Sequence, residues 1–249
     1  MLDIQKAGMW KRISAYLLDV ILLITLIVWV AWVLSLAFGY DDYSNQFNEI
    51  RTQYEEEYNV DFDADFDSLS DEKKMYTEMA FNKFSSNEDA QYAYTMMIML
   101  ALAIVSISIV VAYFILEFIL PVIFKNGRTL GKKIFGVAVM RADGVKISGP
   151  ALFVRAIFGK CIVETMVPIF IVIMILLGNG VVVGLISLIL IALLQIILII
   201  ATKTRSAIHD VLAYTVTVDF VSQVIFNTPE ELLEYKKKLH AEDSLHKER

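Results

Sequence analysis

Residues 181–201 read VVVGLISLILIALLQIILIIA and carry no charged side chain. About 20 consecutive apolar residues, each rising about 1.5 Å along a helix, are needed to cross a hydrocarbon core ~30 Å thick. The segment is therefore predicted to be a transmembrane helix. The turn Gly178-Asn179-Gly180 separates it from a second apolar segment, residues 151–177. So short a connection predicts that the two helices run antiparallel.

Two more apolar segments precede this pair, at residues 13–38 and 94–124, so the sequence predicts four transmembrane helices. Of the 249 residues, 57% are hydrophobic and 20% are charged, whereas soluble domains average roughly 45–50% and 25%. This composition excludes an ordinary soluble enzyme. The first segment is also longer than the hydrophobic region of a signal peptide, which has about 7–15 residues, and this length indicates a retained helix.

The distribution of basic residues predicts the orientation in the membrane. Residues 39–93 hold four of the 22 Lys and Arg but fifteen of the 28 Asp and Glu. Because Lys and Arg are enriched in cytoplasmic loops, residues 1–12, 125–150 and 203–249 are predicted to be cytoplasmic and residues 39–93 extracytoplasmic. The expected location is the cytoplasmic (plasma) membrane, crossed several times, with both termini inside.

The acidic segment has the pattern of a helical cap. Aromatic and apolar side chains recur at helical spacing within residues 43–58 and again within residues 75–84, which predicts two helices. The expected fold class is thus an all-α integral membrane protein with four transmembrane helices and an extracytoplasmic helical insertion.

The connector between these two helices holds carboxylates at positions one, three, five and twelve of an EF-hand calcium loop, namely Asp61, Asp63, Asp65 and Glu72. Position six, which requires glycine in such a loop, is Phe66. Two interpretations stay open. Either the connector is simply acidic and Ser68 or Ser70 caps the next helix, or the four carboxylates form a weak divalent-cation site.

The densest motif on the inner side is residues 127–136, GRTLGKKIFG. Its spacing excludes a Walker A loop, because only three residues separate the first two glycines and a second lysine follows Lys132. Alternating residues 137–141, the turn signal Asp143-Gly144 and residues 145–147 predict a β-hairpin. Residues 215–218 alternate as well and could pair with it, which predicts a small cytoplasmic β-element.

Polar side chains in the four spans fall at one predicted depth. Counting about 1.5 Å per residue from the cytoplasmic boundary puts the acidic and amide groups of the spans between roughly 9 and 13 Å deep. Basic residues lie at or just beneath that level. The predicted polar layer comprises Arg12, Asp19, Glu117, Arg155, Lys160, Glu164 and Gln195.

This layer has two interpretations. It is either a buried ion network that fixes helix packing, with Asp19 and Glu164 neutralised by Arg12, Arg155 or Lys160, or a cavity, open to the cytoplasm, that handles cations or protons. Glu117 has no obvious basic partner on its own helix.

With these residues in view, the chain resembles the RDD family of bacterial and archaeal membrane proteins. The resemblance rests on residues 8–19 (GMWKRISAYLLD), the glycine-rich motif with its Asp143-Gly144 turn, Arg155, and residues 205–215 (RSAIHDVLAYT). The family is named for one Arg and two Asp, which correspond here to Arg12, Asp19 and Asp210. The cytoplasmic motif residues that the resemblance singles out are Gly127, Thr129, Gly131, Lys132, Gly136, Arg205, His209 and Asp210.

The resemblance implies a function in transport, with cation/proton exchange as the leading expectation. The alternative is a non-transporting scaffold or accessory subunit that binds a partner through the outer cap. His209-Asp210 is either a pH-responsive pair, or Asp210 caps a helix end or ties Arg205 to the glycine-rich loop. The three glycines of that loop are expected to permit close backbone approach.

The expected partners follow from this assignment. They are the lipid bilayer, a small cation or proton, and a second copy of the chain, because four helices are few for a transporter acting alone. No nucleic acid and no cofactor is expected. An enzyme is not expected either, since no nucleophile–base pair or phosphate-binding loop is visible. The single cysteine, Cys161, also excludes a disulfide scaffold.

Overall fold

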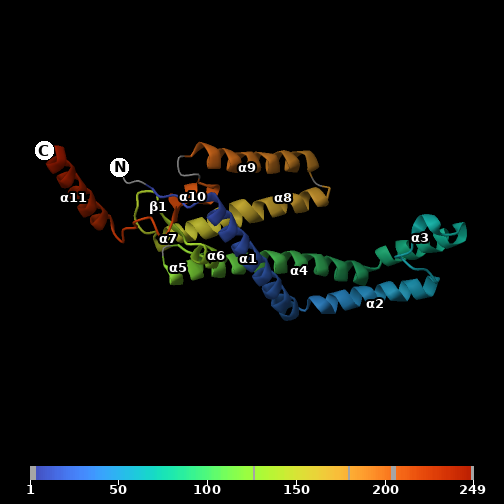
Figure 1. Ribbon diagram of the computed structural model, residues 1–249. Helices are drawn as coiled ribbons and strands as arrows, with labels where there is room; N and C mark the ends of the chain where they lie inside the picture. Colours follow the sequence, from blue (N-terminus) through green and yellow to red (C-terminus); the bar gives the residue numbers. More distant parts are fainter. Residues whose placement is uncertain (1–3, 126, 179, 203–205, 248–249) are drawn as a thin grey trace. The chain divides into compact units, whose positions relative to one another are not determined.

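The computed structural model describes residues 4–125, 127–178, 180–202 and 206–247. Within this part of the chain, four helices are long and apolar enough to cross a membrane: Met9–Phe38, Glu88–Phe124, Gly149–Leu176 and Val181–Ala201. The predicted fold class, a helical membrane protein with four spans, a helical insertion and a small β-element, is confirmed. Figure 1 shows these elements in chain order.

The chain divides into two compact units. Met1–Leu26 together with Ile109–Arg249 form one, called here the core unit, and Ile27–Ser108 form the other, the acidic unit. The first span, α1 (Met9–Phe38), and the helix α4 (Glu88–Tyr113) contribute residues to both.

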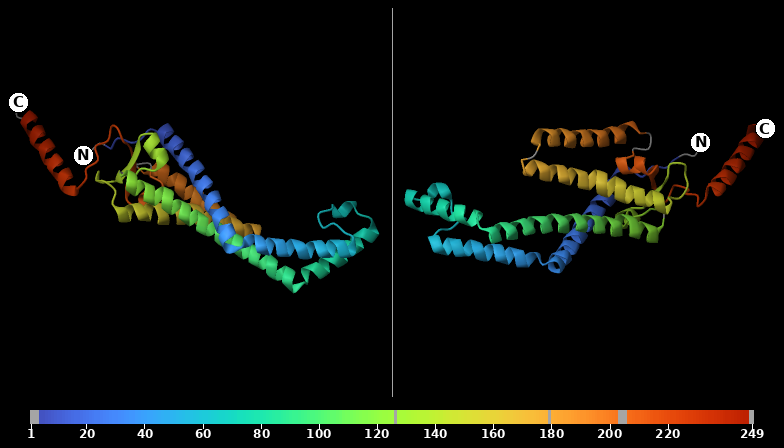
Figure 2. Two further views of the ribbon diagram at one scale, coloured as in Figure 1. Left: turned by 90° about the horizontal axis from the view of Figure 1, so that it is seen from below. Right: turned by 180° about the vertical axis from the view of Figure 1, so that it is seen from behind.

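The last two spans of the core unit form the predicted hairpin. The third span consists of α7 (Gly149–Phe153), η3 (Val154–Met166) and α8 (Val167–Leu176), and the fourth is α9 (Val181–Ala201). Helices α8 and α9 contact each other and run antiparallel, as Figures 1 and 2 show. Of the predicted turn, Asn179 lies outside the described residues.

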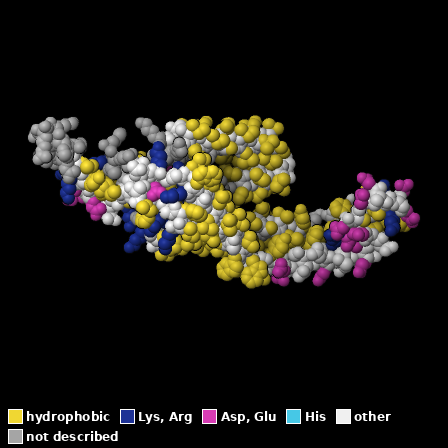
Figure 3. Space-filling model, in the orientation of Figure 1, with side chains coloured by type: hydrophobic (Ala, Val, Ile, Leu, Met, Phe, Trp, Pro, Cys, Tyr) yellow, Lys and Arg dark blue, Asp and Glu magenta, His cyan; other side chains and the backbone are white. Residues whose placement is uncertain are grey.

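Hydrophobic side chains cover α8 and α9 on the face seen in Figure 3. Leu176, Val182 and Ile200 are each more than two-thirds exposed. Soluble proteins rarely expose apolar patches this extensive, whereas lipid tails are as apolar as these side chains. The surface of the hairpin therefore fits a bilayer.

Two of the spans change from α to π winding. The second span passes from α4 through the π-helix η2 (Phe114–Ile119) into α5 (Leu120–Phe124), and the third contains the π-helix η3. Each π-helix ends two residues before a proline, Pro121 or Pro168.

Proline explains the change in winding. Its ring clashes with the carbonyl four residues earlier and it has no N–H to donate, so the carbonyls of Glu117 and Glu164 lose their usual α-helical donors. In the neighbouring turns, backbone N–H groups donate to carbonyls five residues earlier instead of four. The N–H of Leu120 donates to the Ile115 carbonyl, and the N–H of Val167 donates to the Ile162 carbonyl.

The β-element contains the pairing predicted for residues 215–218 but only part of the predicted hairpin. Strand β1 (Val137–Arg141) pairs antiparallel with β2 (Thr215–Asp219), with Val139 opposite Thr217. Residues 145–147, predicted as the second hairpin strand, form only a single bridge to β1. The reason is that the Lys146 N–H donates to the Phe226 carbonyl at 2.8 Å, so this segment pairs with the C-terminal part of the chain instead.

Both faces of β1 are buried. Ala138 and Met140 pack against Val216 and Val218 of β2, while Val139 on the opposite face packs with Ile147 and Leu152 and against Phe118 of η2. The sheet thereby fixes the short helices around it. These short helices are α6 (Leu130–Ile134) and α10 (Ile208–Leu212). A longer helix, α11 (Pro229–Lys247), follows β2.

The acidic unit contains the two predicted helices, α2 (Tyr40–Tyr58) and α3 (Asp71–Ser85). Phe84 is its buried centre, with Phe47, Tyr54 and Phe62 at ring-centroid distances of 5.3, 5.9 and 5.7 Å. Aromatic pairs at such distances add stability beyond their buried area. The helical prediction for this segment is confirmed.

The acidic connector is organised by hydrogen bonds rather than as a ligand set. Asp63 forms an ion pair with Arg51 at 2.8 Å, while Asp61 and Asp65 accept hydrogen bonds from backbone N–H groups two residues on. Ser70 caps α3 by accepting from the Lys73 N–H. No group of three or more His, Cys, Asp or Glu that could hold a metal occurs among the described residues. The structure thus favours the capping interpretation and does not gather Asp61, Asp63, Asp65 and Glu72 into a metal site.

Candidate charged cavity

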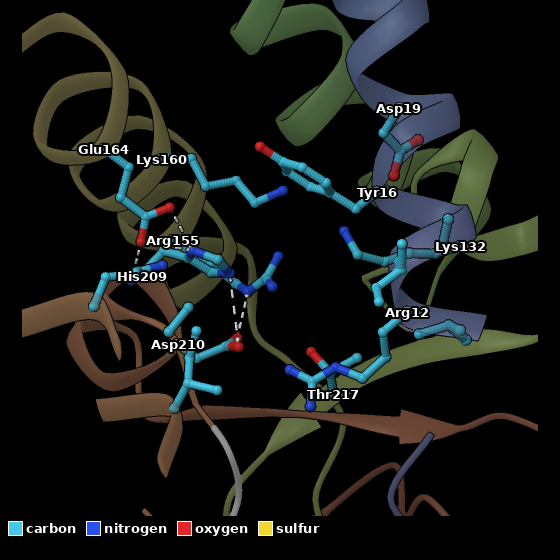
Figure 4. A pocket seen from close by; sticks show the side chains of 16 residues that line it. Arg12, Tyr16, Asp19, Lys132, Arg155, Lys160, Glu164, His209, Asp210 and Thr217 are labelled. Atoms are coloured by element: carbon cyan, nitrogen blue, oxygen red, sulfur yellow. Dashed lines mark hydrogen bonds and ion pairs between the residues drawn. The ribbon is translucent and has the colours of Figure 1, made fainter. Parts of the chain in front are cut away.

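A cavity of about 320 Å³ lies in the core unit (Figure 4). Its lining includes six residues of the predicted polar layer, Arg12, Asp19, Arg155, Lys160, Glu164 and Gln195, and three of the motif residues, Lys132, His209 and Asp210. They come from α1, α6, η3, α9 and α10. The structure therefore brings together side chains from widely separated parts of the chain.

The winding of η3 explains how one helix presents three charged side chains to the cavity. Arg155 and Glu164 are nine residues apart, and at 3.6 residues per turn an α-helix would place them on opposite faces. An i→i+5 helix takes more residues per turn. In η3, Arg155, Lys160 and Glu164 consequently all line the same cavity.

Arg155 and Asp210 form the most deeply buried ion pair of the cavity. The Arg155 Nε donates to Asp210 Oδ1 at 2.9 Å, and the Thr215 hydroxyl donates to the same oxygen at 2.9 Å. Both charged residues are 2% exposed. Burial would raise the pKa of Asp210, but the positive charge of Arg155 and these hydrogen bonds outweigh it and hold that pKa well below its usual value.

This pairing differs from two of the predicted roles of Asp210; for the third, a pair with His209, the His209 Nε2 lies 3.6 Å from Asp210 Oδ2. Asp210 lies inside α10 with its side chain on Arg155 of η3, and not as a helix cap or on the glycine-rich loop. A buried carboxylate needs an opposite charge, and η3 supplies one. Arg205, the other predicted partner, lies outside the described residues.

Glu117 of η2 contacts two lysines that line the cavity. Lys160 Nζ donates to its Oε1 at 2.5 Å, and Lys132 Nζ lies 3.8 Å from its Oε2. The basic partners that Glu117 lacks on its own helix thus come from η3 and α6. Within the described part of the chain, neither Glu117 Oε2 nor Lys132 Nζ has a hydrogen-bond partner.

Lys132 is more than nine-tenths buried, and burial is the main influence on its protonation. Desolvation, reinforced by the positive charges of Lys160 and Arg155, lowers the pKa of Lys132 to about 7, although Glu117 opposes the change. An amine with such a pKa exchanges its proton near neutral pH.

Glu164 is held by His209, not by the predicted bases. The His209 ring nitrogen Nδ1 lies 2.8 Å from Glu164 Oε2, and the His209 backbone N–H donates to Oε1 at 3.0 Å. Burial, and next to it the charge of Arg155, lowers the pKa of His209, against the opposing charge of Asp210 and the bond to Glu164. Gln195 of α9 accepts from the Ile208 N–H at 3.2 Å and so fixes the start of α10.

Close backbone approach makes the His209 contact feasible. A Cβ at Gly159 of η3 would lie 2.5 Å from the Cβ of His209, which is shorter than real contacts allow. Any larger residue at this position would push α10 away from η3. Sequence reasoning did not single out Gly159.

Asp19 joins α1 to the glycine-rich loop. Its carboxylate accepts from the Thr129 hydroxyl at 2.5 Å and from the Gly131 N–H at 2.8 Å, whereas neutralisation by a base was expected. Since helix N-termini favour negative charge, the start of α6 is a suitable partner. A Cβ at Gly131 would lie 2.3 Å from the Ala15 carbonyl oxygen, so the predicted close approach is confirmed here.

The remaining predicted residues to place are Gly127, Gly136 and Arg12. A Cβ at Gly127 would lie 3.0 Å from the Cβ of Val139, so this glycine also permits close approach, while Gly136 has open space around it and that prediction is wrong there. Arg12 lines the cavity near Thr217 (Figure 4). Its neighbour Lys11 forms an ion pair with Asp219 of β2.

Two further polar residues of the cavity, Tyr16 and Thr217, were missed because neither belongs to a charged pattern. The sequence does contain a signal for the π-helical winding of the second and third spans. The spacing Glu-x-x-x-Pro occurs at Glu117 and Pro121 and again at Glu164 and Pro168. In both spans, the proline disrupts the helix at the carbonyl of the acidic residue.

The fold and the cavity define a polytopic membrane protein whose helices surround a cluster of buried ion pairs. A family model described as the RDD family matches residues 6–214. The chain therefore belongs to the RDD family. No curated protein and no solved structure matched the chain in the comparisons made.

Proposed function

We propose that the protein moves a small ion or solute across the membrane in exchange with protons, using the charged cavity as its binding site. In this proposal the protein lies in the plasma membrane with both termini in the cytoplasm and acts as a homodimer without catalysing a reaction. Membership of the RDD family and the four spans support the membrane setting.

The observation that supports transport most directly is that the cavity holds ionisable groups, which cost free energy to bury. Ionisable groups in a membrane protein's interior are expensive and mark ion or proton pathways. Here, three acid–base contacts join different elements around one space: Arg155 with Asp210, Lys160 with Glu117, and His209 with Glu164.

Two lining groups have lowered pKa values that suit proton exchange. Lys132, with its pKa lowered to about 7, and His209, with its pKa below the usual range, both change charge at or below neutral pH. The family resemblance makes cation/proton exchange the leading expectation. The lining, with Arg12, Lys132, Arg155 and Lys160 turned toward one space, favours a solute with negative charge over a bare cation.

The decisive experiment is flux in liposomes. Purified protein is reconstituted with a pH-sensitive dye inside, and gradients of sodium, potassium and phosphate are imposed in turn. We expect a change of internal pH that depends on one of these gradients and that is abolished in Asp19→Asn, which removes a charge at the cavity wall while an amide oxygen can still accept from Gly131.

The matched control is Asp41→Asn, the same change at an exposed position of α2, and its flux should equal that of the unmodified protein. Folding of each variant is checked by circular dichroism. Absence of flux for every gradient, with folded protein, would contradict transport.

A second candidate function is a scaffold or accessory subunit. It is favoured by the exposed apolar side chains of α3, where Met75, Met79 and Phe81 are each about half exposed. Such side chains suit contact with a partner protein. This function predicts that deleting residues 43–84 abolishes recovery of the partner while the four spans stay folded.

A further inference from the structure

We propose that the cavity binds a phosphate group, held by Lys132 and Arg155 with Arg12 opposite them. The proposal rests on the proposed function in that it names the chemical class of the transported or bound solute. It stands on the arrangement of the basic side chains and on the hydrogen-bond partners of the acidic ones.

Four basic side chains from three elements share the cavity. Figure 4 shows the nitrogens of Arg12 from α1, Lys132 from α6, and Arg155 and Lys160 from η3 directed toward one space. Lys132 is 8%, Arg155 2% and Lys160 9% exposed. Arg155 is paired with Asp210, and both lysines lie close to Glu117, so an added anion would take the donors that these contacts leave unused.

The acidic side chains of the lining are bound by the protein itself. Asp19 accepts from Thr129 and Gly131, Glu164 contacts His209, and Asp210 accepts from Arg155 and Thr215. Their oxygens are therefore poorly placed to receive a cation from solution.

Lys132 and Arg155 keep donors to offer. Lys132 Nζ has no hydrogen-bond partner among the described residues and projects into the cavity. Arg155 uses Nε for Asp210, and its terminal nitrogens lie on the cavity side in Figure 4. A planar guanidinium beside an ammonium is a combination that proteins use to bind phosphate oxygens.

Size and charge agree with this ligand. The cavity of about 320 Å³ compares with ~30 Å³ for one water molecule in the liquid, so it has room for a phosphate group and a small organic part or several waters. A phosphate monoester carries roughly −1.5 to −2 charges at pH 7. Several converging cations match that charge better than they match the single charge of a carboxylate.

Binding of a phosphate group would also be coupled to the uptake of a proton. With a pKa lowered to about 7, Lys132 is only partly protonated near neutral pH. An anion beside it favours the charged form, so each bound phosphate group would draw a proton into the cavity. Coupled binding of this kind would make movement of the phosphate group dependent on protons.

The test measures binding of inorganic phosphate to the purified full-length protein by isothermal titration, with chloride at matched ionic strength as the reference. Lys132→Met is expected to weaken binding by at least about tenfold, since a charge-assisted hydrogen bond is lost. Lys132→Arg retains the charge and should still bind. Lys133→Met, at the exposed neighbouring position of α6, is the matched control and should bind like the unmodified protein.

A second arm identifies the source of the phosphate group. Phosphatidylcholine vesicles with and without phosphatidic acid are offered to the same proteins. Saturable binding that depends on Lys132, whether of inorganic phosphate or of phosphatidic acid, supports the proposal and names the free or lipid source. If neither binds, or if Lys132→Met binds as well as Lys133→Met does, the proposal is overturned.

The outcomes for this site and for transport are separable. Flux of sodium or potassium without any phosphate binding would overturn the phosphate site and leave the transport proposal in place. Lys132-dependent phosphate binding without flux of any tested ion would do the reverse, because it would support the site and contradict transport.

Discussion

Charge pairs hold single residues of the core unit in place, and the free energy that each pair contributes depends on how deeply it is buried. Arg155 and Asp210 are almost inaccessible, whereas Lys11 of the Lys11–Asp219 pair has a side chain that is 50% exposed. Exposed pairs contribute roughly 0–1 kcal/mol. Removing one partner of a buried pair costs about 3–5 kcal/mol, because it leaves an uncompensated charge.

Arg155→Leu is therefore expected to destabilise the protein by roughly 3–5 kcal/mol, and Lys11→Leu by no more than about 1 kcal/mol. Thermal unfolding in detergent, followed by circular dichroism, measures both. The double variant Arg155→Leu/Asp210→Leu should recover part of the loss. Equal effects of the two single changes would show that the buried pair has no special weight.

His209 predicts how stability depends on pH. Its pKa is lowered in the folded protein, chiefly by burial. The positive charges of Arg155 and Lys160 lower it further, while the charge of Asp210 and the hydrogen bond with Glu164 oppose the change. As the pH falls below about 6.5, the unfolded chain takes up a proton that the folded chain does not. Stability is therefore expected to fall with pH from about 6.5 down to the lowered pKa.

Melting temperatures measured across this pH range test the expectation. His209→Gln removes the titrating group, so its melting temperature should depend less on pH between about 6.5 and the lowered pKa. The lowered pKa of Asp210 adds a further loss of stability at lower pH in both proteins. A pH slope that His209→Gln leaves unchanged would assign the dependence to another group.

At the scale of elements, the winding of η3 decides which charges meet. Because Pro168 leaves the Glu164 carbonyl without its α-helical donor, Pro168→Ala should restore that bond and favour α winding. That change would turn Arg155 and Glu164 toward opposite faces. It would also rotate Cys161, the chain's single cysteine, which is fully buried in η3.

Reaction of Cys161 with a maleimide reports this rotation. We expect slow labelling of the unmodified protein and faster labelling of Pro168→Ala. Pro229→Ala, at the first position of α11, is the control and should label slowly. Slow labelling of Pro168→Ala would instead mean that the ion pairs, and not the proline, maintain the π-helix.

The same element explains what the sequence could and could not predict. Hydropathy alone located the four spans, and a count of depth placed Asp19, Glu117 and Glu164 at a similar level, because both depend only on length along a helix. The identity of each partner depends on rotation about the helix axis. Regular α winding cannot bring Arg155 and Glu164 to one cavity, so the pairs with Asp210 and His209 were not predicted.

At the scale of the whole molecule, the two units have separate cores and can be tested separately. The acidic unit is centred on aromatic packing around Phe84, whereas the described cavity residues all belong to the core unit. Deleting residues 43–84 should therefore leave the cavity intact. We expect the shortened protein to remain monodisperse, to melt at nearly the same temperature, and to retain both proton-coupled flux in liposomes and Lys132-dependent phosphate binding. Loss of flux with intact folding and phosphate binding would mean that transport requires the acidic unit, since the cavity alone would then be insufficient.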